Sequence, residues 1–274
     1  MKLLSLPDEV LNLALKNLLP SFRSQSLAET YSFTVPADLF ILRLVSRRLH
    51  RIATPLAWRR VQLQIASPSA TNYTDYAAVT AAAQTCFRSI VRCRFFHEHP
   101  QLAAHVRILF VSVQWHAESP DLARDALRAA TKAMSSLRTI LVWDTDVLAF
   151  RDIRQLLQKP LLRAVCLIDI DCSAIPAQCS LGTGVKMLRI VNSVCPATLV
   201  VGAGASLECV SIELAGSYHG PGHALTLREM PWKSLREVAL VGCINDMDWF
   251  CFLDGFEVGF VFNLMPGIFP FVFR

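Results

Sequence analysis

The sequence has few of the short motifs that identify common classes of enzyme. It contains no Gly-x-Ser-x-Gly segment, the turn that presents a nucleophilic serine in many hydrolases. Gly182-Thr183-Gly184 and Gly202-Ala203-Gly204 lack both a third glycine and a following Lys-Ser or Lys-Thr pair. We therefore interpret them as turns rather than as phosphate-binding loops. No segment of the sequence gives positive support for catalysis.

A disulfide framework and a secretion signal are also missing. The nine cysteines are odd in number and mostly lie within apolar segments, which predicts reduced thiols in the cytoplasm or the nucleus. Near the N-terminus, Pro7-Asp8-Glu9 interrupts the apolar run only four residues after Lys2, and no small-residue cleavage site follows. We therefore expect no secretory signal peptide.

Metal-ligand spacing is equally poor. Cys86, Cys93, His97 and His99 fall within fourteen residues (86 to 99), but the gaps of six, three and one residues between them match no standard zinc-binding spacing. Core thiols are the favoured interpretation, and no metal or cofactor is expected. A cysteine nucleophile paired with a distant histidine stays open as an alternative, because residues far apart in sequence meet in a fold.

The composition excludes a mainly disordered chain, because 53% of the residues are hydrophobic and the mean hydropathy is +0.38. The net charge of +5 permits acidic partners without requiring nucleic acid. Arg43, Arg47 and Arg51 recur at helical spacing. We interpret this stripe as a solvated face or as a surface that steers an acidic partner. No aromatic residues interleave with it, so it does not predict nucleic-acid binding.

Two short helical segments begin the chain. The first runs from about Leu6 to Leu19, and the second spans Asp38 to Ala53 and is expected to stop at Pro55. The polar residues 21–37 separate them. A unit this small buries too little apolar surface to be stable alone, so it needs a partner or a following domain. This favours a docking module over a catalytic one.

These segments resemble the F-box. The resemblance rests on Leu6-Pro7 with Glu9-Val10-Leu11, on the block from Leu42 to Arg47, and on Pro55 followed by Trp58-Arg59. It implies docking onto the Skp adaptor of cullin-RING ubiquitin ligases, although the connection over residues 21–37 is longer than usual. The positions that the resemblance assigns to adaptor contact are Leu6, Pro7, Glu9, Val10, Leu11, Leu42, Leu44, Val45, Arg47 and Trp58.

A repeated pattern occupies most of the remaining chain, with apolar residues at the first, fourth and sixth positions of each unit. Successive starts differ by 31, 25, 23, 22 and 28 residues, by subtraction of 106, 137, 162, 185, 207 and 235. These periods lie in or near the roughly 20–29 residues of leucine-rich repeats, which the pattern resembles. It predicts stacked units that share a parallel sheet. The units begin at Val106, Leu137, Leu162, Val185, Leu207 and Leu235.

The connecting segments predict helices in the early units and turns in the later ones. One helix is expected after Thr74, a second over residues 120–134 and a shorter third over residues 150–157. From residue 174 onward the connections are rich in Gly, Ala and Pro and predict loops. The side chains expected to point inward from the first two helices are Val79, Ala82, Ala83, Cys86, Phe87, Ile90, Val91, Leu122, Leu127 and Ala130.

The polar ladder residue of leucine-rich repeats is weak in this chain. An Asn or Cys is expected eight positions after each start, and only Cys243 supplies one. Thr145 and Ser193 are partial substitutes, whereas Ile170 and Ala215 are apolar. The pattern therefore predicts an irregular, degenerate array of the kind seen in fungal-type F-box proteins with leucine-rich repeats.

The third, fifth and seventh positions of each unit should lie on the concave face of the predicted sheet. This face is unusually apolar in the second and third units. Our hypothesis is that a patch centred on Trp143 and bordered by Arg189 and Glu213 binds a protein target, because Trp and Arg are common interface anchors. In the alternative interpretation, a loop or the N-terminal helices cover this face.

The tail over residues 246–274 is strongly apolar. Its charge-free run, residues 258–273, is shorter than a membrane-spanning helix and contains Pro266 and Pro270. No membrane insertion is expected. The tail also lacks the polar outer face of a terminal cap, so we expect it to be irregular or truncated and to leave the last unit uncapped.

The sequence thus predicts an α/β protein with a small all-helical F-box-like module over residues 1–62. An irregular leucine-rich-repeat solenoid with parallel strands follows over residues 63–245, and the apolar tail over residues 246–274. The expected function is non-catalytic substrate recognition in a Skp–cullin–F-box ubiquitin ligase. One alternative is a leucine-rich scaffold without a ligase role, in which the helices only cap the repeats. An enzyme with an unrecognised site, such as a thiol hydrolase, is a less favoured alternative.

Overall fold

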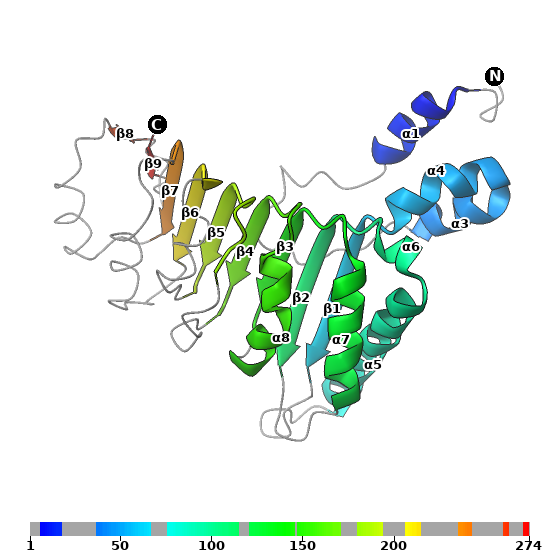
Figure 1. Ribbon diagram of the computed structural model, residues 1–274, viewed down its shortest axis with the longest axis horizontal. Coiled ribbons are helices and arrows are strands. Elements are labelled where there is room, and N and C mark those ends of the chain that lie inside the picture. The colour runs from blue at the N-terminus through cyan, green and yellow to red at the C-terminus, as the bar shows by residue number, and fades with distance from the viewer. Residues whose placement is uncertain are drawn as a thin grey trace.

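A long, mainly parallel sheet follows a group of N-terminal helices in this protein, which is of mixed α/β class (Figure 1). The computed structural model describes residues 6–17, 37–66, 76–114, 121–145, 147–170, 180–193, 206–214, 235–242, 260–262 and 271–273. The N-terminal helices lie at one end of the molecule, and the last strands of the sheet lie at the other end (Figure 1).

The strands of the sheet follow one another in chain order. Each strand from β1 to β6 pairs in parallel with the next, and Leu109, Ile140, Val165, Leu188 and Val210 occupy one row of the register. The repeated pattern therefore predicted the strands and their pairing correctly. The strands are β1 (Arg60–Ala66), β2 (Ile108–Gln114), β3 (Thr139–Trp143), β4 (Ala164–Ile168), β5 (Met187–Val191), β6 (Cys209–Leu214) and β7 (Glu237–Gly242).

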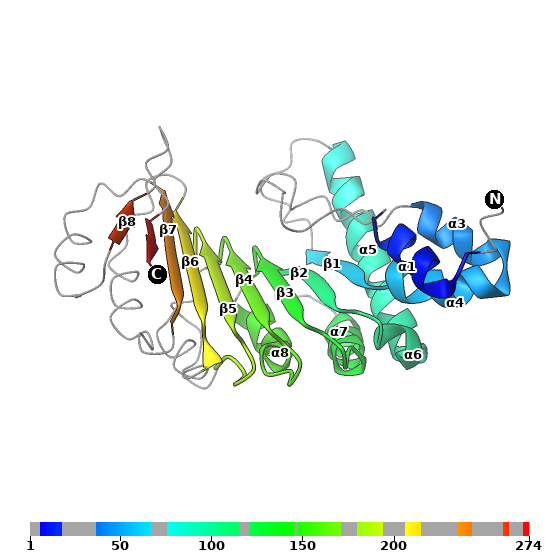
Figure 2. The same ribbon diagram turned by 90° about the horizontal axis from the view of Figure 1, so that it is seen from above.

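The main core lies between this sheet and two helices on one face, α7 (Asp121–Ala133) and α8 (Val147–Leu157) (Figure 2). In the units that begin at residues 106, 137, 162 and 185, the first, fourth and sixth positions are all exposed by 1% or less. Leu127 and Ala130 point into this core as expected. Leu122 does not, because it is 67% exposed and Ala123, one residue further on, is buried in its place.

The polar ladder residues fill their expected role more closely than their identities suggested. Thr145 Oγ1 accepts a hydrogen bond from Val113 N at 3.2 Å, and Ser193 Oγ accepts one from Ile170 N at 2.9 Å. Each hydroxyl also donates to the carbonyl two residues before it. Each hydroxyl therefore joins two neighbouring units, because it satisfies a buried backbone N–H of the preceding unit.

The strand β1 was missed by the sequence analysis, and α5 (Tyr76–Glu98) covers its free edge. Ser89 Oγ accepts from Gln64 N at 3.0 Å, and Arg92 donates to Gln62 O at 2.8 Å. These bonds satisfy backbone groups that an open edge would expose. The expected domain boundary after residue 62 consequently falls inside β1, and the helical module ends before Arg60.

The inward face of α5 also differs from the expectation. Phe87 is 68% exposed and Val91 is 47% exposed, whereas Cys93 and Phe96 are fully buried. Cys86 and Ile90 pack against the main core as expected, and Ser89, Cys93 and Phe96 complete the buried stripe. A short helix, α6 (Pro100–Ala103), then leads into β2.

The N-terminal module consists of α1 (Asp8–Asn17), α3 (Ala37–Val45) and α4 (Arg47–Ala57). The single helix expected over residues 38–53 is wrong, because Ser46 has an extended backbone and its hydroxyl caps the second helix by accepting from Leu49 N at 3.1 Å. Pro55 lies inside α4 rather than ending it. The break also means that Arg43, Arg47 and Arg51 do not share one helical stripe.

The tail contributes strands to the sheet, contrary to the irregular tail that we expected. β9 (Phe271–Phe273) pairs antiparallel with β7, and β8 (Phe260–Phe262) pairs antiparallel with β9. The free edge of β7 is therefore paired. Within the described ranges, the molecule has no helix that is both long and apolar enough to span a membrane.

Replacing Ser193 with alanine should lower the free energy of unfolding by about 1–3 kcal/mol, because the buried Ile170 N–H would lose its partner. Thr183, which is exposed in a nearby turn, is the matched control, and Thr183→Ala should change little. Urea denaturation followed by circular dichroism measures both variants. Equal stabilities for the two would show that the hydroxyl does not hold the units together.

Candidate functional site

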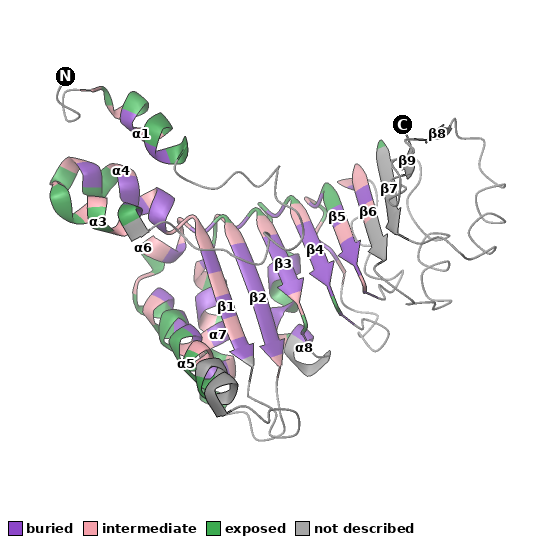
Figure 3. Ribbon diagram, turned by 180° about the vertical axis from the view of Figure 1, so that it is seen from behind, coloured by how far each residue is buried: buried purple, intermediate pink, exposed green. Residues whose placement is uncertain are grey.

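The helical module has its own small core and one aromatic connection to the sheet. Leu15, Leu39, Ala53, Leu56 and Ala57 form this core, with Phe40, Leu42 and Ile52 packed against it. A core of this size leaves much of each short helix unburied. The outer faces of α1 and α3 are exposed along much of their length (Figure 3).

Trp58 provides the aromatic connection. Its ring lies 5.5 Å from Phe40 of α3, 5.4 Å from Phe95 and 5.5 Å from Phe96, both of α5. The Arg43 guanidinium lies 5.7 Å from the centre of the Trp58 ring, and Arg43 Nε donates to Thr54 Oγ1 at 3.1 Å. These contacts fix the orientation of the module against α5.

Two ion pairs connect α1 to α4. Asp8 Oδ1 accepts from Arg48 Nε at 2.6 Å, and Asp8 Oδ2 accepts from Arg51 Nη2 at 2.5 Å. Arg48 also donates to the Leu6 carbonyl, so one side chain holds both the entry turn and the first residue of α1. The hydrogen bond from Arg48, and then that from Arg51, hold the pKa of the Asp8 carboxyl below its ordinary value.

The two outer helices carry an unusual number of exposed apolar side chains. Among the described residues, ten large apolar side chains are exposed, and half of them belong to α1 and α3 although these two helices are short. Exposed apolar side chains that form a contiguous patch are typical of contact sites. The five residues, which we call the outer apolar set, are Val10 (46% exposed), Leu13 (62%), Ile41 (58%), Leu44 (86%) and Val45 (60%).

The structure divides the ten residues that the sequence assigned to adaptor contact. Pro7, Glu9, Val10, Leu44, Val45 and Arg47 are exposed, and Leu6 is half-buried. The other three are less accessible. Leu11 is only 1% exposed, whereas Leu42 and Trp58 are half-buried, Leu42 against the module core and Trp58 against the aromatic rings of α3 and α5.

The sequence analysis missed Leu13 and Ile41. Leu13 follows Val10 by one helical turn, and Ile41 precedes Leu44 and Val45 at the i+3 and i+4 positions. The helical spacing was visible. It could not be used, because apolar residues occur on both faces of these helices and spacing alone does not say which face is buried.

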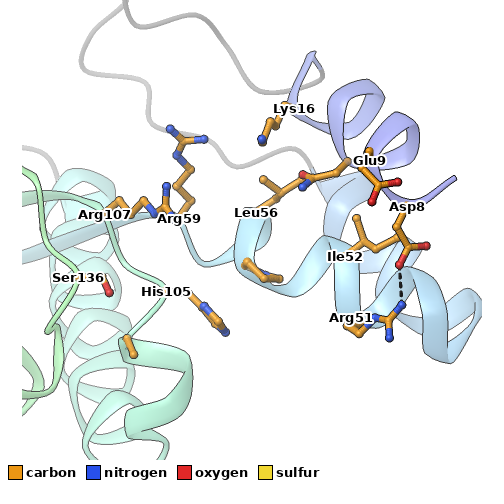
Figure 4. Close-up of a pocket in the computed structure, with 13 residues that line it drawn as sticks. Asp8, Glu9, Lys16, Arg51, Ile52, Leu56, Arg59, His105, Arg107 and Ser136 are labelled. Atoms are coloured by element: carbon orange, nitrogen blue, oxygen red, sulfur yellow. Dashed lines mark hydrogen bonds and ion pairs between the residues drawn. The ribbon is translucent and has the colours of Figure 1, made fainter.

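A cavity of about 450 Å³ lies between the module and the start of the sheet. Asp8, Glu9 and Lys16 of α1 lie on one side of it, and Arg59 and Arg107 lie on the other (Figure 4). Burial lowers the pKa of the Arg59 guanidinium, and the nearby charges of Arg107 and Arg138 lower it further. The sequence analysis did not identify this pocket.

The proposed target patch lies on the other face of the sheet. Phe110, Leu141, Cys166, Ile168 and Val191 form a second apolar cluster there. The apolar character of this face was therefore predicted correctly. The members of the cluster are exposed by 8% or less, so its centre is largely inaccessible to solvent.

The three residues assigned to that patch occupy different strands. Trp143 is half-buried at the end of β3, 6.0 Å from Phe110, and its Nε1 donates to Asp169 Oδ2 at 3.0 Å. Arg189 is half-buried in β5, in register with Cys166. Glu213 lies in β6, and its side chain falls outside the described residues.

Cys86, Cys93 and His97 of α5 and His99, the N-cap residue of α6, do not gather into a cluster of metal ligands where the structure describes them. Cys93 is fully buried, and burial raises the pKa of its thiol to about 12. Burial also raises the pKa of the Cys86 thiol. His99 stacks on Phe95 at 4.4 Å, and His97 is exposed. No cluster of three potential metal ligands occurs among the described side chains.

Comparison with known proteins adds no relatives: no protein-family model matches the chain, and no curated protein matches it.

Acidification should loosen α1 from α4. The pKa of Asp8 is lowered in the folded state, so its contribution is present above the ordinary value of 3.8 and is lost as the pH falls through the folded pKa. Amide hydrogen-exchange protection of α1 should therefore fall between pH 5 and pH 3, after correction for intrinsic rates. In the Asp8→Asn variant, the protection of α1 should be low at both pH values.

Asp121→Asn is the matched control, because Asp121 is exposed and makes only a 4.0 Å pair within α7. It should behave as the unmodified chain does. Strong α1 protection at pH 5 in Asp8→Asn would contradict the role of the ion pairs.

Proposed function

We propose that the protein is a non-catalytic substrate receptor of a Skp–cullin–F-box ubiquitin ligase. The N-terminal helices dock the Skp adaptor, and the repeated units bind a protein target. The protein performs no chemistry itself and holds the target near the ubiquitin-charged enzyme of the assembly. We further propose that it acts in the cytoplasm or the nucleus.

The exposure of Leu44 carries the proposal. Leu44 was assigned to adaptor contact from the sequence, and at 86% it is the most exposed of the large apolar side chains that the structure describes. Burying an exposed side chain of this kind against a partner contributes about 1.5–3 kcal/mol. Val10 and Leu13 of α1 and Ile41 and Val45 of α3 are the other exposed apolar side chains of these helices.

The second part of the proposal is that the repeated units form a leucine-rich-repeat solenoid. In-register parallel strands, a helix after β2 and after β3, and the ladder hydroxyls of Thr145 and Ser193 all support this interpretation. Such arrays present an extended surface that suits protein targets better than small substrates.

Trp143 is the residue that we propose as the centre of target recognition. It lies at the edge of the buried cluster on the sheet face opposite α7 and α8, where its ring is partly accessible. Arg189 and Glu213 are proposed as its polar border. Tryptophan at the margin of an apolar cluster combines a large contact area with low conformational freedom.

The alternative of a leucine-rich scaffold has one specific observation in its favour. Trp58 packs on Phe95 and Phe96 of α5, as would be expected if the module capped the repeats. An outer cap alone gives no reason for the exposure of Leu44 and Val45, because a terminal cap should present a polar outer face. The raised pKa values of the Cys86 and Cys93 thiols do not favour the thiol-hydrolase alternative.

Replacing Leu44 with aspartate should abolish binding of the purified Skp adaptor to the full chain, because the change puts a charge into the proposed apolar contact. Leu122→Asp is the matched control, since Leu122 is 67% exposed on α7, away from the module. Isothermal titration calorimetry measures both variants. If the unmodified chain does not bind the adaptor, or if both variants bind it equally, the receptor proposal fails and the scaffold interpretation stands.

Replacing Trp143 with alanine should lower recovery of the target in affinity purification while leaving adaptor recovery unchanged, because the change removes the accessible ring of the patch. Leu161→Ala, at a position 44% exposed in the turn before β4, provides the control. Quantitative mass spectrometry of the co-purified proteins gives the measurement. Unchanged recovery of every adaptor-dependent partner would remove Trp143 from the target site.

A further inference from the structure

A row of basic side chains follows the edge of the sheet at which the strands begin. The second position of successive units is Arg107, Arg138, Arg163 and Lys186, and Arg59 holds the same place before β1. Backbone bonds align them: Arg107 N donates to Arg59 O, Arg138 N to Arg107 O, and Arg163 N to Arg138 O, at 2.7–2.9 Å. Neighbouring strands are about 4.8 Å apart, so the row is dense in positive charge.

The members of the row differ in how their charge is compensated. Lys186 pairs with Glu208 at 2.5 Å, and Arg163 donates to the Gly184 carbonyl. Among the described residues, no carboxylate pairs with Arg59, Arg107 or Arg138. Burial lowers the pKa of the Arg59 guanidinium, and repulsion from the charges of Arg107 and Arg138 lowers it further. Three uncompensated guanidinium groups therefore gather at the β1 end of the row.

This end of the row opens into the cavity beneath the module. Arg59 and Arg107 line it together with His105, Ser136 and Lys16 (Figure 4). Asp8, on the opposite wall, is already paired with Arg48 and Arg51. Glu9 and Lys16 of α1 also line this wall and carry opposite charges, so the cavity is positively charged on the side of the sheet and nearly balanced on the side of α1.

Two polar atoms of the cavity residues lack partners. Arg59 Nε and Asn12 Oδ1 are both buried and form no hydrogen bond. Buried polar groups are nearly always satisfied, and an unsatisfied one costs about 1–3 kcal/mol. Both residues line the cavity, Asn12 from α1 and Arg59 from the start of the sheet, so a polar occupant that reached these atoms would satisfy them by accepting from Arg59 and donating to Asn12.

We propose that this cavity binds a small phosphorylated molecule that also carries hydroxyl groups. Its phosphoryl oxygens accept from Arg59 and Arg107, with Arg138 supplying long-range attraction, and a ligand hydroxyl donates to Asn12. The volume of about 450 Å³ fits a small molecule and excludes a folded partner. Guanidinium groups suit this role because their planar donors match phosphate oxygens.

The consequence is a ligand held between two parts of the chain. Asn12 belongs to α1, whereas Arg59 and Arg107 belong to the start of the sheet. Binding therefore fastens the module to the repeats and stabilises their relative placement. The site does not depend on the proposed ligase role, since it would exist equally in a scaffold.

Calorimetric titration of the full chain with inorganic pyrophosphate tests the site, because pyrophosphate offers the phosphoryl chemistry without an unknown remainder. The unmodified chain should bind pyrophosphate more tightly than inorganic phosphate. Arg107→Gln should weaken binding by about tenfold or more, the effect of one charge-assisted hydrogen bond. Arg107 is exposed and its fold contacts are made by its backbone, so the variant should fold.

Arg154→Gln is the control matched in charge, because Arg154 is exposed on α8 away from the cavity. It should bind as the unmodified chain does. Arg138→Gln is a second variant, expected to weaken binding severalfold and to reduce its salt dependence. No binding of pyrophosphate, or equal loss in Arg107→Gln and Arg154→Gln, would overturn the proposal. Tighter binding of polyglutamate than of pyrophosphate would also overturn it, in favour of an acidic peptide.

Discussion

The packing of Trp58 between Phe40 of α3 and the pair Phe95 and Phe96 of α5 determines where the N-terminal helices lie relative to the sheet. Trp58 is also the C-cap residue of α4, and it is followed directly by Arg59, which lines the basic cavity, and by β1. Both proposed contacts depend on it. The outer apolar set faces away from the chain only because the inner faces of these helices are held by this cluster and by the module core.

Much of the sheet could be predicted from the sequence because each unit repeats the same short pattern of apolar residues. An apolar residue at the fourth and sixth positions fills one face of a strand, and this holds whatever the neighbours are. The edge strand β1 was missed although Val61, Leu63 and Ile65 alternate with Gln62 and Gln64, a pattern typical of a half-buried strand. The break at Ser46 and the continuation of α4 through Pro55 were beyond prediction, because both depend on caps and packing that local propensity does not include.

The candidate site was predictable only in part, for a similar reason. Leu11, Leu42 and Leu44 look alike in the sequence, yet the first is fully buried and the third is the most exposed of its kind among the described residues. Which face of a short helix turns inward is decided by Trp58 and by the Asp8 ion pairs, which are contacts between segments. The basic row illustrates the same limit. Each arginine alone reads as a solvated surface charge, and only the parallel register brings Arg59, Arg107 and Arg138 together.

The two edges of the sheet differ in charge, and this bears on how a target and a docking partner share the molecule. At the edge where the strands end, Asp144, Asp169 and Asn192 each follow a strand directly with positive φ values of 42°, 51° and 45°, a backbone conformation that Asp and Asn tolerate better than most residues. Two of them accept side-chain hydrogen bonds, Asp144 from Gln114 and Asp169 from Trp143. The basic row lies at the opposite edge, beside the module. In the proposed receptor, a target centred on Trp143 would meet an acidic margin, and an acidic partner would be attracted to the edge beside the N-terminal helices. The two proposed partners would then bind at once without competing for the same charges.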